Sequence, residues 1–274
     1  MTLLAVFGSE ARRLLARRAV RWGTAIALGI VVLMVAVSTI RSTGTGPTDH
    51  TMRLNQLWLE RPGGTDGNLL GVISTYVYVL IVGIAATAVG GDYRAGTIGT
   101  LLTWEPRRVR VAGARIGAIV SVSIVLFLLI IGVLVGGWSL GATWRGSTAN
   151  LRSDFWLNLV AVIARGTLVA AVLSVITAGI AFVTRGTVGA VMSWFGYLIG
   201  IEAILASRVP SLRPSLLLSN LGAFFQGADV PERSGFSFLP GHIAQPGPGL
   251  LRGVTIAMVV AGLGVLAFSR RDVT

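Results

Sequence analysis

Lysine and cysteine are both missing from this sequence, and all 23 of its basic residues are arginine. Without lysine there is no phosphate-binding loop ending in Gly-Lys-Ser/Thr and no lysine Schiff base. Without cysteine there is no thiol nucleophile, no disulfide framework and no lipidated thiol. The two histidines, His50 and His242, are far apart in the sequence and have no cluster of other ligands around them. This pattern predicts ordinary surface histidines and no metal site.

Charged residues of either sign are also scarce. Only 12% of the residues are charged, 53% are hydrophobic, and the mean hydropathy is +0.78. A soluble core of this size cannot hide so much apolar surface, so the composition indicates a membrane protein. The net charge of +12 does not point to a nucleic-acid partner. The arginines lie between long apolar runs, where they are typical of a signal that sets membrane topology.

Six predominantly apolar runs have about the length that a helix needs to cross a hydrocarbon core of about 30 Å. The expected spans cover residues 22–40, 69–90, 116–140, 166–184, 187–206 and 253–268. We therefore expect an all-α polytopic membrane protein whose residues 1–274 form a single transmembrane domain. An even number of spans places both termini on the same side of the membrane.

The arginines are distributed unevenly between the two sets of connections. The set made of residues 1–21, 91–115, 184–187 and 269–274 carries 13 arginines in 56 residues, whereas the opposite set carries 9 in 90. Because cytoplasmic connections carry the excess of basic residues, the first set and both termini are expected in the cytoplasm. Arginine without lysine, beside abundant Gly, Ala and Val, is typical of a GC-rich bacterial genome, so the expected location is the bacterial plasma membrane.

Residues 1–21 have the pattern of an amphipathic helix that precedes the first span. Apolar residues recur at helical spacing on one side, namely Leu4, Phe7, Ala11, Leu14 and Leu15. Polar residues occupy the other side, namely Ser9, Glu10, Arg12, Arg13, Arg17 and Arg18. We expect this helix to lie along the inner interface, with its arginines among anionic lipid headgroups. The alternative is a frayed basic tail that serves only as a topology signal.

Two regions do not fit a simple span. Residues 154–184 would form about 46 Å of helix at 1.5 Å per residue, so the helix either protrudes or bends near Gly166. Residues 207–249 are rich in Pro and Gly but contain the apolar stretches 216–218 and 223–225. We expect short exterior or partly re-entrant helices there, packed against protein so that their backbone groups are satisfied.

Residues 91–115, which we call the elbow, join the second and third spans. Gly96 and Gly99 allow another backbone to approach closely, and Ile98, Leu101 and Leu102 could form a small apolar ridge. The nearby proline, at position 106, suits the first turn of a new helix. The sequence therefore predicts a short, rigid cytoplasmic knob, although Gly96-Thr97 could also be a simple polar turn. The arginines at 107, 108 and 110 also fit a solvated or lipid-facing basic cluster.

In this elbow, an acidic residue, an Arg, Gly-Thr, a Leu-rich turn, Pro and an Arg cluster follow one another between two spans. This order resembles the ABC-2 type transporter permeases, and the similarity extends over most of the chain. The resemblance implies a coupling helix seated in a groove of a separate ATP-binding cassette subunit. The residues it implicates are Asp92, Tyr93, Arg94, Gly96, Thr97, Leu101, Leu102, Pro106 and Arg107. The family often has Glu where this chain has Asp92.

The resemblance also implies a function: the permease subunit of an exporter, working with a second permease subunit, identical or not. ATP and Mg would be bound and hydrolysed in the partner subunit, so this chain would hold no cofactor and would not be an enzyme. Its other contacts would be with membrane lipids, and the substrate would be an amphiphile. Gly196 and Gly200 have the four-residue spacing that lets helices approach closely. They could serve subunit packing, since this family's subunits meet partly through span five, or packing within one subunit.

Glu202 lies inside an expected span and Arg165 directly before another, and a charge within the membrane costs about 2.5 to 3.5 kcal/mol. Counted from the cytoplasmic ends of their spans, the two lie at depths that differ by about 6 Å. They could form an ion pair or line the substrate path, or they could be placed at the interface and wetted. An ion-coupled transporter or channel that uses these two residues as a relay is therefore the alternative function.

Overall fold

The computed structural model describes residues 3–42, 52–57, 69–97, 107–148, 151, 153–209, 216–227 and 246–270. Among these residues the secondary structure is helical, and the sole β-type pairing is an isolated bridge between Arg53 and Ser147. Six helices are long and apolar enough to cross a membrane. The prediction of an all-α polytopic membrane protein is confirmed.

The helices follow the expected spans closely and extend beyond most of them. They are α1 (Leu3–Ala16), α2 (Arg18–Arg41), η1 (Leu54–Leu57, a 3₁₀-helix), α3 (Leu69–Arg94), α5 (Arg108–Arg145), α6 (Phe155–Thr184), α7 (Thr187–Phe195), η2 (Gly196–Glu202, a π-helix), α8 (Ala203–Arg208), α9 (Leu217–Gln226) and α10 (Pro246–Arg270). The fourth span forms one helix, α6, that is unbroken over 30 residues and continues through Gly166. Span five, in contrast, is divided into α7, η2 and α8, which the sequence did not reveal.

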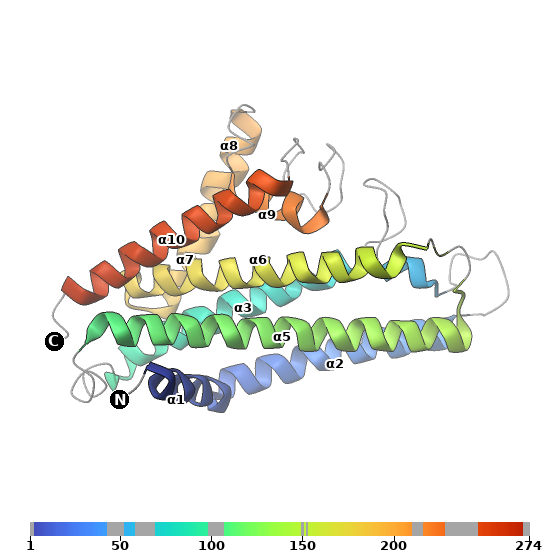
Figure 1. Ribbon diagram of the computed structural model, residues 1–274, viewed down its shortest axis with the longest axis horizontal. Coiled ribbons are helices and arrows are strands. Elements are labelled where there is room, and N and C mark those ends of the chain that lie inside the picture. The colour runs from blue at the N-terminus through green and yellow to red at the C-terminus, as the bar shows by residue number, and fades with distance from the viewer. Residues whose placement is uncertain are drawn as a thin grey trace.

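The three central helices are α3, α5 and α6, as their burial shows. Half of the apolar window of each is buried, against 11% for α2 and 17% for span five and for α10. Figure 1 shows α2, α3, α5 and α6 running side by side, with both ends of the chain at the end of the bundle where α3 finishes. The tip of span five, α8, stands apart from the other helices in the same view. The peripheral helices thus have most of their surface available to lipid.

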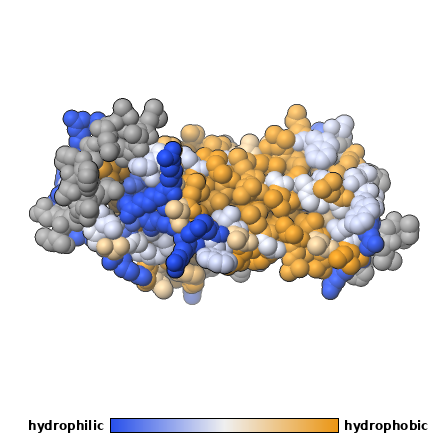
Figure 2. All heavy atoms as spheres, turned by 90° about the horizontal axis from the view of Figure 1, so that it is seen from below, coloured by the Kyte–Doolittle hydropathy of each residue, from blue (hydrophilic) through white to orange (hydrophobic). Residues whose placement is uncertain are grey.

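The face formed by α1 and α2 has the surface expected at a bilayer. Large apolar side chains are exposed in a helical stripe along α2, namely Trp22, Ile26, Ile30, Leu33, Val37 and Ile40. In Figure 2 hydrophilic residues gather towards one end of this face, and a broad hydrophobic belt covers the middle. In water such a belt would be unfavourable, so this surface indicates contact with hydrocarbon.

Helices α6 and α10 cross through a pair of glycines. A Cβ at Gly264 would lie 2.6 Å from the carbonyl oxygen of Gly179, and a Cβ at Gly179 would lie 2.7 Å from the carbonyl oxygen of Val260. Only glycine permits such close backbone contact, which is a common way to pack helices in membranes. Gly262, two residues from Gly264, faces open space instead.

The crossing gives a first prediction. Gly264→Ala should lower the thermal stability of the detergent-solubilised protein, because its methyl group forces α10 away from α6 at a cost of about 1 to 3 kcal/mol. Gly262→Ala, which adds the same methyl group where nothing lies within 4 Å, should melt no lower than the wild type. Equal melting temperatures for the two variants would contradict the close crossing.

Candidate functional site

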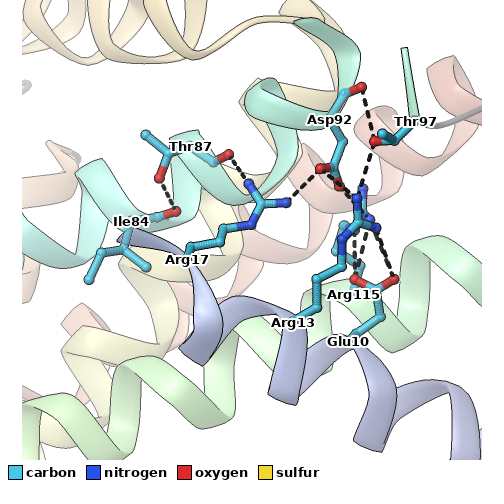
Figure 3. Close-up of polar contacts among 8 residues, drawn as sticks. All are labelled: Glu10, Arg13, Arg17, Ile84, Thr87, Asp92, Thr97 and Arg115. Carbon is cyan, nitrogen blue, oxygen red and sulfur yellow. Dashed lines mark hydrogen bonds and ion pairs between the residues drawn. The ribbon is translucent and has the colours of Figure 1, made fainter. Parts of the chain in front are cut away.

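Asp92, the first polar residue of the elbow, lies in the last turn of α3 and is buried. Its carboxylate is the centre of a cluster that we call the Asp92 hub, in which five charged side chains meet from α1, the α1–α2 junction, α3 and α5. The members are Asp92, Glu10, Arg13, Arg17 and Arg115. Figure 3 shows the three guanidinium groups converging on the two carboxylates.

Three arginines contact the carboxylate of Asp92. Arg17 Nη2 lies 2.6 Å and Arg13 Nη2 3.1 Å from Oδ1, and Arg115 Nη2 lies 2.6 Å from Oδ2. Arg115 also pairs with Glu10 at 3.2 Å, and these two side chains are nearly inaccessible to solvent. A buried charge is tolerated only when it is paired and hydrogen-bonded, so each member of the hub depends on the others.

The junction between α1 and α2 is fixed by the hub. Arg17 interrupts the two helices with extended backbone angles, φ −65° and ψ 133°. Its guanidinium donates from Nη1 to the carbonyl oxygen of Thr87 at 2.7 Å and from Nη2 to Asp92. A Cβ at Gly91 would lie 3.0 Å from Arg17 Nη1, so the glycine leaves room for the guanidinium against α3. The first two helices are therefore tied to the end of α3 at the point where the chain bends.

The described start of the elbow is anchored to the same cluster. Arg13 Nη2 donates to the hydroxyl oxygen of Thr97 at 3.2 Å, and that hydroxyl in turn donates to the carbonyl oxygen of Asp92 at 3.5 Å. Gly96 has the left-handed backbone angle φ +65° that favours glycine and follows the last turn of α3. Arg94 and Gly96 are exposed. The chain thus leaves α3 along a defined path while presenting an exposed arginine.

Several expectations about this region need correction. Glu10 was expected on the polar, interfacial side of the first helix, but it is 4% exposed and pairs with Arg115. Arg13 and Arg17 were expected among lipid headgroups, but they turn inward because the buried Asp92 needs cationic partners. Among the arginines of that polar side, Arg12 and Arg18 are exposed, as expected.

The other candidates of the elbow divide into two groups. Arg107 is exposed and directly precedes α5, and Tyr93 is half-buried in α3. Leu101, Leu102 and Pro106 lie outside the described residues. The sequence missed Arg115 and Glu10 as members of the site. A signal was present for Arg115, a charged residue on an otherwise apolar helical face, but its pairing with Glu10 joins positions 105 residues apart.

Gly196 and Gly200 lie within the π-helical part of span five, and nothing is found within 4 Å of an added Cβ at either position. They therefore do not pack against another helix in the part of the chain that the structure describes. The large apolar residues around them are exposed, as at Phe195, Ile199 and Ile201. This surface is open to lipid or to another chain, so the expected role in subunit packing stays a prediction.

The two intramembrane charges do not pair with each other. Glu202 accepts hydrogen bonds from the backbone amides of Leu218 and Ser219, both at 3.0 Å. Arg165 Nε donates to the carbonyl oxygen of Ala161 in its own helix, and its guanidinium lies beside Gly227. The depth argument from the sequence could not foresee this arrangement, because α9 lies between the two groups and offers each of them one of its ends.

The hub yields a second prediction. Asp92→Asn should destabilise the attachment of α1 by about 3 kcal/mol, because three arginines lose the negative charge that compensates them in a buried site. Limited digestion with trypsin should then cut at the arginines of residues 12–21 much faster than in the wild type. Arg94→Gln changes an exposed charge two residues away and should leave the cleavage rate unchanged. Unaltered cleavage in Asp92→Asn would contradict the structural role of the hub.

Comparisons with known proteins identify no relative of this chain: no protein-family model matches it, and neither does any curated protein. What the protein does must therefore be argued from its own residues. Two features carry that argument, namely six membrane-spanning helices and a buried ionic hub at the start of the segment that joins the second and third spans.

Proposed function

We propose that this chain is the membrane-spanning subunit of an ATP-driven exporter of the ABC-2 type. In this proposal a separate ATP-binding subunit docks on the elbow in the cytoplasm and hydrolyses ATP, while this chain forms the path for an amphiphilic substrate. A second permease subunit, identical or not, completes the transporter. The membrane is the bacterial plasma membrane, with both termini and the elbow on the cytoplasmic side.

The observation that carries the proposal is the rigid mounting of the elbow. The residues that begin it are held through Asp92 to α1, to the α1–α2 junction and to α5. Force can be transmitted through a docked segment only if the segment cannot move independently of the helices behind it. A loop that merely connected two spans would need no such anchoring, whereas a docking point for a moving subunit does.

The charges at this end of the bundle support the orientation. The two acidic residues of the hub form ion pairs inside the protein. Five arginines are exposed near the ends of the helices that meet there, namely Arg12, Arg18, Arg94, Arg107 and Arg185. An excess of exposed arginine is typical of the cytoplasmic side of a membrane protein. It also makes acidic side chains the complementary feature to expect on a docked partner.

The relay that an ion-coupled transporter would need finds no support in the positions of Arg165 and Glu202. Each group is engaged by α9 or by its own helix, and no ion pair joins them within the described part of the chain. A proton relay requires groups close enough to exchange a proton. The ATP-driven function is therefore the one that the geometry favours.

Docking on the elbow leads to a third prediction. A photo-crosslinking amino acid at position 94 should capture an ATP-binding protein in membranes of the source cell, because this exposed position begins the elbow. The same reagent at position 12, on the exposed side of α1, is the matched control and should capture much less of it. Arg94→Glu should reduce copurified ATP hydrolysis at least about tenfold if one interfacial charge contact is reversed, while Arg12→Glu should not. Equal capture at both positions, or full hydrolysis with Arg94→Glu, would contradict docking on the elbow.

A further inference from the structure

The short helix α9 has no residue of its own that can cap its first turn. The residue before it is Leu216, and its first residue is Leu217. In a helix the first backbone amides have no intrahelical partner, and inside a membrane protein an unsatisfied amide costs several kcal/mol. Some other part of the chain must therefore supply the acceptors.

Span five supplies the acceptors for the backbone amides of the first three residues of α9. The amide of Leu217 donates to the hydroxyl oxygen of Tyr197 at 3.0 Å, and the amides of Leu218 and Ser219 both donate to Glu202 at 3.0 Å. Glu202 is completely buried, so these amides take the place of water as hydrogen-bond donors to its carboxylate. Charge-assisted hydrogen bonds of this kind are among the stronger ones in proteins, and the positive end of the helix adds to them.

The π-helix explains how both acceptors reach α9. In an α-helix, residues five apart such as Tyr197 and Glu202 would be about 140° apart around the axis. In η2 the turn is wider, with the amide of Ala203 bonded to the carbonyl oxygen of Leu198 five residues earlier. This wider turn brings residues five apart towards the same face. π-turns inside α-helices are often found at functional positions.

The other end and the middle of α9 are also held. After the helix ends at Gly227 (φ +70°), the Arg165 guanidinium lies beside it, near the negative end of the helix dipole. Phe225 enters the core edge-to-face with Tyr78, at 6.3 Å between ring centroids, and Tyr78 is stacked on Phe127. Phe225 thereby packs between the middle parts of α3, α5 and α6.

Span five touches the hub region at its other end. A Cβ at Gly90, two residues before Asp92, would overlap the backbone of Gly186 and Thr187, where α7 begins. The end of α3 and the start of span five are therefore in direct backbone contact. Span five is only 17% buried, and α7 is held to α6 by the buried hydrogen bond that Trp194 Nε1 donates to Thr177 Oγ1 at 2.9 Å. A continuous chain of contacts leads from the hub through Gly90 and span five to Glu202.

We infer that span five is a lever that links the elbow to α9, and that Glu202 is the positioning residue through which this lever holds α9 closed against α3, α5 and α6. The inference rests on the proposed function, because it describes how a movement imposed at the elbow reaches the opposite side of the membrane. When span five shifts, the carboxylate leaves the amides of α9, and α9 with Phe225 is released from its seat. Arg165 stays with α6, bonded to the carbonyl oxygen of Ala161 and beside Gly227.

The test uses the absence of cysteine from the chain. Ala223, on α9, is fully buried, so Ala223→Cys in the purified full-length protein in nanodiscs should react slowly with a water-soluble maleimide. Adding Glu202→Leu should raise the rate at least about tenfold, because the charged acceptor for two amides is lost. Adding Glu202→Gln, which keeps a carbonyl oxygen, should raise it only about threefold.

The lever is tested from its near end in the same assay. Gly90→Ala pushes the start of α7 away from α3 and should raise the reactivity of Ala223→Cys at least about threefold. Gly83→Ala, on the same helix with nothing within 4 Å of its Cβ, should have no effect. A response to Glu202→Leu without any response to Gly90→Ala would overturn the lever.

Two further cysteines complete the design. Ala178→Cys, fully buried in α6, should stay unreactive in every background, and reaction there would mean that the whole bundle had loosened and would overturn the specific role of Glu202. Thr148→Cys, exposed just beyond the end of α5 and away from α9, should react equally in all variants, and any change there would also overturn it. Unchanged slow reaction of Ala223→Cys with Glu202→Leu would overturn the closure. Because no ATP and no partner are present, these outcomes do not depend on whether an ATP-binding subunit docks.

Discussion

The compensation of one buried carboxylate, that of Asp92, is the constraint on which the half of this structure that begins the elbow depends. An isolated ionised carboxylate away from water is so unfavourable that the fold must bring cations to it. The three arginines that do so come from α1, from the α1–α2 junction and from α5. Their convergence fixes α1, the bend into the first span and the start of the elbow in one unit. A docked subunit would then act on several helices at once.

The opposite half follows a different solution to the same problem. Glu202 and Arg165 lie in apolar spans, and each is placed near the end of α9 whose dipole is complementary to its charge. The helix between them gains a cap that its own sequence lacks, and the two charges gain partners without meeting. Since the acceptor is carried by span five, which is only 17% buried, this solution leaves α9 dependent on a peripheral helix.

Much of the fold could be predicted from the sequence, because lipid solvent imposes a length and a composition on each span. The second expected span begins at Leu69, where α3 begins, and the fourth expected span ends at Thr184, where α6 ends. The hub and the hydrogen bonds from α9 to Tyr197 and Glu202 could not be predicted. They depend on which turn of one helix meets which turn of another. Asp92 was recognised as important from its place in the elbow, but nothing local reveals that Arg115 and Glu10 share its site. The π-turn was equally hidden, because Gly196 to Glu202 reads as an ordinary apolar stretch.

The central claim is that the elbow faces the cytoplasm, where an ATP-binding partner can reach it, while the opposite end of the bundle, where α5 ends, faces outward. The most direct test is the sidedness of single cysteines in this cysteine-free chain, with a membrane-impermeant maleimide applied to intact cells and to inside-out vesicles. The account predicts that Arg94→Cys is modified only in inside-out vesicles and Thr148→Cys only in intact cells. Modification of Arg94→Cys from outside intact cells would contradict the account.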